Sequence, residues 1–148
     1  MKDKYEVRTD EYETIRYYKN NLRHREDGPA ILRISGTKEW WINGKRHRED
    51  GPAVEFYNGS KSWYIDDKRH REDGPAIERN GGTKEWYING LCHREDGPAV
   101  EWYGGVEYWV VNGKEITDKV KEWLKTNNIP DHSLWTNKEK AMFKLKFL

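Results

Sequence analysis

The heptapeptide His-Arg-Glu-Asp-Gly-Pro-Ala occurs four times without a change, and successive copies begin 23 residues apart. A strict period of this size predicts a stack of one small supersecondary unit, in which every motif side chain recurs as a row of equivalent copies. Most catalytic sites need one asymmetric pocket, so the repetition favours a binding surface over an enzyme. The copies begin at His24, His47, His70 and His93.

Each repeat contains two turn signals, which together predict a β-hairpin. One series is represented by Asn58-Gly59 and the other by Asn43-Gly44, which becomes Asp66-Asp67 in the next repeat. Asn-Gly between apolar or aromatic runs favours a type I′ turn, because both central residues need positive φ. We therefore expect a short strand, such as residues 38–42, and a longer strand, such as residues 45–57, in each repeat.

The longer strand is interrupted by Asp50-Gly51-Pro52, where we expect a bend or bulge, because proline donates no hydrogen bond to a ladder. Four units of two strands give eight strands, and a degenerate half-repeat over residues 14–23 adds one or two. The predicted fold is mainly β, an extended twisted antiparallel sheet of tandem hairpins with a C-terminal α-helical segment. The predicted parts are an N-terminal capping half-repeat (1–23), four hairpin repeats (24–115) and a C-terminal helical cap (116–148).

The C-terminal segment has a different periodicity. Apolar residues recur at positions i, i+4, i+7 and i+8 from Ile116, which predicts an amphipathic helix that ends near Asn127-Asn128. Residues 136–139 have the form of a capping box and predict a second helix. Apolar residues alternate from Phe143 onward, so a strand over the last nine residues stays open. The apolar residues of the first helix are Ile116, Val120, Trp123 and Leu124.

Alternation along the strands assigns the two faces of the sheet. Pairing across Asn58-Gly59 places Val54 opposite Trp63, on the face predicted to be the core. A single-layer sheet cannot bury this face alone. We expect the C-terminal helix to cover part of it, and sheet twist, self-association or a partner to cover the rest. The predicted core residues are Ile31, Trp40, Ile42, Val54, Trp63, Ile65, Ile77, Trp86, Ile88, Val100, Trp109 and Val111.

The period of 23 and residues 43–47, Asn-Gly-Lys-Arg-His, resemble the MORN repeat, whose pattern includes a Gly-Lys-x-His-Gly turn. Arg48 stands where that pattern has its last glycine. The fuller string Asn-Gly-Lys-x-His-Arg-Glu-Asp-Gly-Pro-Ala is similar to repeat arrays of bacterial and bacteriophage proteins. The resemblance covers about residues 14–115. It implies a MORN-like hairpin sheet and a protein-binding or membrane-associated scaffold rather than a catalyst.

A stripe of aromatic residues with arginines beside them is expected on the second face of the sheet. Read structurally, these residues form stabilising cross-strand pairs. Read functionally, the rings supply contact area and the guanidinium groups orient a protein segment or a small anionic, nucleotide-like ligand. The candidate binding residues are Trp41, Tyr64, Tyr87, Arg46, Arg69, Arg48 and Arg71, with Glu55, Glu78 and Glu101 expected close to the stripe.

The histidines and aspartates of the motif are expected to form a structural ladder, and the motif arginines to reach carboxylates of the neighbouring repeat. Equivalent positions in successive hairpins lie roughly 9–10 Å apart, whereas zinc–nitrogen distances are about 2.0–2.1 Å. A metal shared between copies is therefore not expected, and neither is any other cofactor. A row of polar anchors for an extended, charged ligand stays the alternative. The predicted ladder residues are His24, His47, His70, His93, Asp27, Asp50, Asp73 and Asp96.

Other functional classes find little support. Glu49 and Asp50 are adjacent in an extended segment and point to opposite faces, so they cannot act together as acid and base. A net charge of +1, from 27 basic and 26 acidic residues, gives no preference for nucleic acid or anionic membrane. Cys92 is the only cysteine, and the chain has no apolar run that spans a bilayer. We expect a cytoplasmic protein, in the host cytoplasm if a phage encodes it.

The function predicted from these features is non-catalytic binding to a protein partner. The resemblance to phage arrays implies an accessory protein that inhibits a host defence factor. Two alternatives stay open, namely sequestration of a small nucleotide-like signal and self-assembly of the chain into a structural homo-oligomer.

Overall fold

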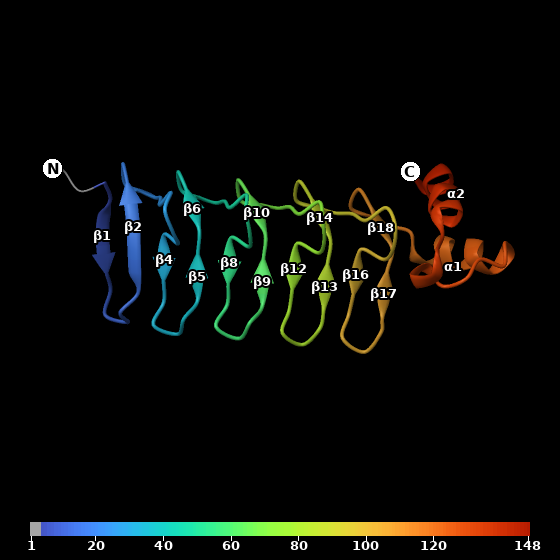
Figure 1. The fold of residues 1–148 in the computed structure, drawn as a ribbon, viewed down its shortest axis with the longest axis horizontal. Helices are drawn as coiled ribbons and strands as arrows, with labels where there is room; N and C mark the ends of the chain where they lie inside the picture. The colour runs from blue at the N-terminus through green and yellow to red at the C-terminus, as the bar shows by residue number, and fades with distance from the viewer. Residues whose placement is uncertain (1–3) are drawn as a thin grey trace.

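The computed structural model describes residues 4–148, which form tandem antiparallel hairpins followed by two helices (Figure 1). The predicted mainly β fold is confirmed. The hairpins stand side by side along the long axis, from β1 (Glu6–Thr9) at one end to α1 (Thr117–Thr126) and α2 (Asn137–Phe147) at the other. Residues 1–3 of the predicted capping half-repeat (1–23) lie outside the described residues.

One long antiparallel sheet contains eleven strands, which follow one another nearly in chain order. It grows by two strands with each repeat, and β3 pairs only with β2. The sheet consists of β1, β2 (Ile15–Lys19), β3 (Leu22–Arg23), β4 (Ile31–Leu32), β5 (Lys38–Glu39), β8 (Val54–Glu55), β9 (Lys61–Ser62), β12 (Ile77–Glu78), β13 (Lys84–Glu85), β16 (Val100–Glu101) and β17 (Glu107–Tyr108).

Each repeat also forms a second, separate hairpin, so the prediction of two strands per repeat is wrong. The strand changes partner at Trp40, whose N–H donates to the carbonyl of Ala53 (2.8 Å) while its carbonyl accepts from the N–H of His47 (3.1 Å). The chain therefore leaves the long sheet at this residue and pairs back on itself. These hairpins are β6 (Trp41–Ile42) with β7 (Lys45–Arg46), β10 (Tyr64–Ile65) with β11 (Lys68–Arg69), β14 (Tyr87–Ile88) with β15 (Leu91–Cys92), and β18 (Val110–Val111) with β19 (Lys114–Glu115).

The turns of these small hairpins have the predicted type I′ geometry. Asn43 and Gly44 have φ of 49° and 81°, and Asp66 and Asp67 have φ of 50° and 66°. Each turn also donates a backbone N–H to the preceding repeat, as Gly44 does to the carbonyl of Arg23 (2.9 Å). The turn sequence therefore closes its own hairpin and joins it to the previous one.

The turn at Asn58-Gly59 differs from the prediction. Gly59 has positive φ (85°) but Asn58 does not, and the N–H of Phe56 donates to the carbonyl of Ser60 (2.9 Å). The loop therefore contains three residues with glycine at the bulge position, rather than two. This extra residue moves the register by one, so Val54 pairs with Ser62 instead of Trp63.

Burial follows the predicted core face only in part, since the buried members of that face are Ile31, Val54, Ile77, Trp109 and Val111. The alanine that ends each motif is fully buried, and Val54 packs with Ala53 and Tyr64 in one buried cluster. Trp63 is only half-buried, because the register shift removes it from the position opposite Val54. The half-buried members of the predicted core are Trp40, Ile42, Trp63, Ile65, Trp86, Ile88 and Val100.

The C-terminal cap confirms both predicted helices. Helix α1 begins after Ile116 and ends one residue before Asn127, and α2 begins with the predicted capping box at Thr136 and Glu139. The alternative of a terminal strand is wrong, because the capping box and packing of Phe143 keep this segment helical. Within residues 4–148, neither helix is long and apolar enough to cross a membrane.

Candidate functional site

The four copies of the heptapeptide, at residues 24–30, 47–53, 70–76 and 93–99, form the motif loops. Each motif loop is organised around its arginine. The guanidinium group of Arg48 lies 4.1 Å from the ring centroid of Trp40. Its Nε donates to Asp50 (2.9 Å), and its Nη1 donates to the carbonyl of Pro52 (3.3 Å) and to Glu55 (3.2 Å). The predicted ladder to carboxylates of the neighbouring repeat is therefore wrong, because both carboxylates belong to the same repeat as the arginine. The stacking on Trp40 is what joins this arginine to the preceding repeat.

The same arrangement recurs at Arg71 and Arg94, which lie 4.0 Å from their tryptophan rings. The motif glycine permits this packing, since a Cβ atom at Gly51 would lie 3.1 Å from Cζ of Arg48. The hydrogen bond from Arg48 lowers the pKa of Asp50 below its ordinary value, and the neighbouring charge of Arg48 lowers it further. The motif loop is thus a compact structural unit, and its arginine is already paired.

Each motif histidine joins the start of its repeat to the turn of the small hairpin at the end of the same repeat. Nδ1 of His70 accepts a hydrogen bond from the backbone N–H of Asn89 (3.1 Å), which belongs to the turn of the next small hairpin. Nε2 of His70 faces Glu72 at 3.7 Å. His24, the most buried of the four, makes the equivalent bond to Asn43 (3.1 Å). His24 and His70 are thus hydrogen-bonded to the backbone, and a structural ladder of the motif histidines stays a prediction.

The predicted aromatic stripe is present, and arginines fill the spaces between its rings. Arg46 lies 4.1 Å from the ring centroid of Tyr64 and 5.8 Å from that of Trp41, and its Nε donates to Asp67 (2.7 Å). Tyr64 is only 8% exposed. The stacked arginine joins two successive repeats at Tyr64, whereas Trp41 and Tyr87 are half-buried. Glu55, Glu78 and Glu101, which were expected beside the stripe, pair instead with Arg48, Arg71 and Arg94.

Arg69 completes the stripe at its C-terminal end. It lies 5.1 Å from the ring centroid of Tyr87, and its Nη1 donates to the hydroxyl of Tyr87 (3.4 Å). Burial and the charge of Glu85 raise the pKa of Tyr87 above its ordinary value. In the next repeat Cys92 replaces the arginine. Burial, and then the charge of Glu85, raise the pKa of the Cys92 thiol to about 11, so this thiol is a poor nucleophile.

Open surface is found between successive motif loops, in three equivalent grooves that the sequence did not predict. The floor of each groove consists of a tryptophan, an isoleucine and a histidine, and its walls are two consecutive motif loops. Lys144 of α2 also lines groove C. Their volumes are about 630, 680 and 740 Å³. The floors are Trp40, Ile42 and His47 in groove A, Trp63, Ile65 and His70 in groove B, and Trp86, Ile88 and His93 in groove C.

The rims of grooves B and C are acidic. The side chains of Glu49 and Glu72 are 85% and 83% exposed, and each faces Nε2 of a motif histidine, at 3.6 and 3.7 Å. The motif arginines cannot neutralise these rims, since each is held by its own aspartate and glutamate. Each groove therefore combines an apolar floor with an exposed carboxylate.

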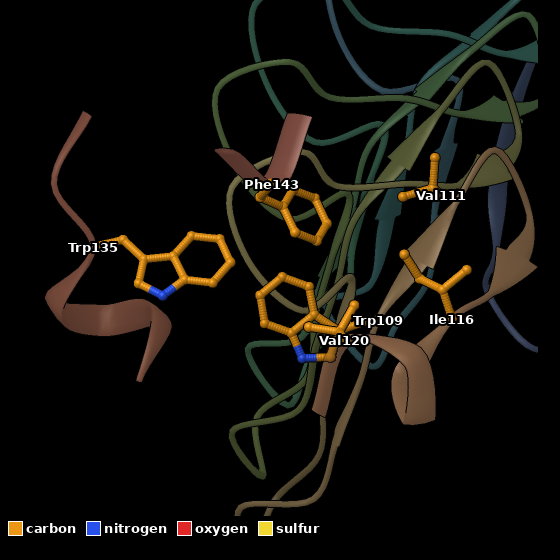
Figure 2. Packing of buried hydrophobic residues seen from close by; sticks show 6 residues of the cluster. All are labelled: Trp109, Val111, Ile116, Val120, Trp135 and Phe143. Atoms are coloured by element: carbon orange, nitrogen blue, oxygen red, sulfur yellow. The ribbon is translucent and has the colours of Figure 1, made fainter. Parts of the chain in front are cut away.

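A fourth position of the same kind is filled by the chain itself. Its floor is formed by Trp109, Val111 and Ile116, and Phe143 of α2 packs 5.2 Å from Trp109 between ring centroids (Figure 2). The next residue, Lys144, places its ammonium group 2.7 Å from Glu95 on the last motif loop. A sequence signal for this position exists, since Ile116 stands one period after His93 and replaces the motif histidine.

A small cluster of possible metal ligands lies at the same end of the sheet. Glu107, Asp131 and His132 bring ligand atoms within 4.8 Å of one another. Asp131 already accepts hydrogen bonds from the backbone N–H and the hydroxyl of Ser133, as the cap of a 3₁₀ turn over His132–Leu134. The cluster is accounted for as part of the cap structure.

The chain matches no protein-family model, and it matches no curated protein sequence.

Proposed function

We propose that this chain is a non-catalytic protein-binding module whose partner docks on grooves A, B and C. One observation carries the proposal. At the fourth position Thr117 replaces the motif arginine, and Phe143 of helix α2 covers Trp109. In grooves A, B and C the motif arginine stacks on the floor tryptophan, and the space beside it stays open. Helix α2 thus supplies one example of a helix packed on this series of positions.

The chemistry of the grooves supports a protein ligand. Half-buried tryptophans at the bottom of a depression offer large apolar area to a partner, and such residues dominate binding energy at protein interfaces. The exposed carboxylates of Glu49 and Glu72 form the polar rim that surrounds a typical interface core. Three copies in a row extend the surface along the array.

The arginines that a nucleotide-like ligand would need are held by contacts within the chain. Arg46 is stacked on Tyr64 and paired with Asp67, and Arg48 is stacked on Trp40. A phosphate group would have to displace these contacts. Inhibition of a host defence factor by a phage accessory protein stays a prediction from the sequence resemblance, as does a cytoplasmic location.

The proposal is tested with a charge reversal on the groove rims, Glu49→Lys with Glu72→Lys, which alters exposed side chains. The matched control is Lys61→Glu with Lys84→Glu, at exposed positions of β9 and β13. The measurement is native mass spectrometry of the protein purified gently from its own cells. We expect a protein of defined stoichiometry on the wild type and on the control, and its loss from the rim variant. Retention by the rim variant would show that the partner binds elsewhere.

A further inference from the structure

We propose that the occupant of grooves B and C is a lysine-bearing helix of a protein partner. It inserts an aromatic side chain onto the tryptophan floor and places the following lysine on the rim glutamate. This inference rests on the proposed function and specifies the partner's chemistry.

The chain's own helix α2 supplies the template. Phe143 is fully buried, with its ring against Trp109, and Lys144 is bound to Glu95 at 2.7 Å. Two consecutive residues of one helix thus contact both parts of the site, the apolar floor and the acidic wall. Val120 of α1 and Trp135 cover the floor together with Phe143. The helix-in-groove arrangement is a common mode of peptide recognition.

The wall that Lys144 contacts is repeated along the array. Glu95 is the motif glutamate of the loop that precedes the fourth position. The equivalent glutamate is Glu49 in the loop that precedes groove B and Glu72 in the loop that precedes groove C. These two glutamates are more exposed than Glu95, whose side chain is 47% exposed beside Lys144. Their charge is therefore available to a cation from outside the chain.

In groove A the glutamate of the preceding motif loop is already neutralised from within, although Glu49 lines the opposite wall. This preceding residue, Glu26, contacts Lys4 at 3.1 Å and Lys19 at 3.5 Å. Hydrogen bonds from Lys4 and His24 lower the pKa of Glu26 to about 2. Because this carboxylate has two lysines of its own, grooves B and C are the preferred sites for a partner's lysine.

The spacing of the grooves suits neighbouring helices. Helix α2 runs roughly along the strand direction, across the long axis of the array (Figure 1). Grooves one repeat apart are separated by roughly 9–10 Å, which is two strand spacings. Packed helices lie about 8–10 Å apart. Adjacent helices of a bundle can therefore enter grooves B and C together.

The test uses a fluorescently labelled peptide of residues 136–148 as the probe and the full chain as the receptor, with binding followed by anisotropy. We expect Phe143→Ala in the peptide to abolish binding, and Lys144→Ala to weaken it by roughly two- to fivefold, the equivalent of one exposed ion pair. The receptor with Glu49→Lys and Glu72→Lys should also bind more weakly. A Lys144→Glu peptide should regain affinity for that receptor.

Each other result overturns the inference. If the peptide does not bind, or if the charge exchange restores nothing, a lysine-bearing helix is not the ligand; the proposed function is then still judged by partner loss from the rim variant. If the chain alone forms dimers by sedimentation and the rim variant does not, the occupant is a second copy of the chain. The Lys61→Glu, Lys84→Glu receptor should bind the peptide as the wild type does.

Discussion

The ammonium group of Lys144 lies 2.7 Å from a carboxylate oxygen of Glu95, which ties helix α2 to the last motif loop. This contact lowers the pKa of Glu95 and raises that of Lys144. It also identifies the motif glutamate as the rim of a groove, because the neighbouring residue Phe143 fills the floor beside it. The array therefore contains one occupied example of the surface that it leaves open three times.

Phe143 should hold the cap in place. Phe143→Ala removes a fully buried ring from the cluster around Trp109, and we expect a loss of about 3–5 kcal/mol in the free energy of unfolding. Leu145→Ala is the matched control, because Leu145 is 90% exposed and should change stability by less than about 0.5 kcal/mol. Urea unfolding followed by tryptophan fluorescence measures both. Equal effects would mean that α2 does not pack as described.

The motif arginine should not tolerate lysine. Arg71 stacks on Trp63 and donates to Asp73 and Glu78, and an ammonium group reproduces neither the planar stack nor the fork of donors. We expect Arg71→Lys to lower the free energy of unfolding by about 1–2 kcal/mol. Arg33→Lys, at an arginine that is more exposed than Arg71 and pairs with Glu39, should have little effect. A stable Arg71→Lys protein would contradict a structural role for the loop.

The motif glycine should be required for its lack of a side chain. A Cβ atom at Gly97 would lie 2.7 Å from Cζ of Arg94, which is held against Trp86 and cannot easily move. We expect Gly97→Ala to destabilise the protein by about 1–3 kcal/mol. At Gly81 nothing lies within 4 Å of the added atom, so Gly81→Ala should be neutral or slightly stabilising. Thermal unfolding of the two variants compares them directly.

Acid should weaken the array. Hydrogen bonds from Arg48 and Arg71 hold the pKa values of Asp50 and Asp73 below their ordinary value of 3.8. A carboxyl group whose pKa is lower in the folded state contributes stability above its unfolded pKa and loses it as pH falls toward the folded pKa. We expect the urea midpoint to drop below about pH 4. The drop should be smaller in a protein with Asp50→Asn and Asp73→Asn, and an identical profile would exclude these pairs as its cause.

The single thiol should react slowly. Burial and the charge of Glu85 raise the pKa of Cys92 from 9.0 to about 11, which lowers its thiolate fraction at pH 8 on the order of 100-fold. Alkylation by iodoacetamide at pH 8 should therefore be much slower in the folded protein than in urea. Similar rates in both would show that Cys92 is accessible and its pKa ordinary.

Much of the fold follows from local sequence. The type I′ turn at Asn43-Gly44 needs two residues that tolerate positive φ, and the capping box at Thr136 needs only its own four residues. The loop at Asn58-Gly59 was harder to predict, because the same dipeptide also fits a three-residue turn with glycine at the bulge. That choice moved the register by one and left Trp63 half-buried.

The candidate site was not predictable in the same way. The repeat shows that each motif loop is copied, but not that its arginine folds back over the tryptophan of the preceding repeat. For this reason the sequence predicted Arg48 and Arg71 as ligand-binding residues. In the structure both arginines are held by internal contacts. The grooves are formed by neighbouring repeats together, and no single motif contains one.

The most direct measurement is an indole ¹H–¹⁵N spectrum of the full chain, recorded with and without the peptide of residues 136–148. We predict that the signals of Trp63 and Trp86, on the floors of grooves B and C, shift on addition of the peptide. The signal of Trp109, which α2 already covers, should stay in place. Unchanged signals of Trp63 and Trp86, or a shift confined to Trp41 on the other face, would contradict the assignment of the open grooves as the binding surface.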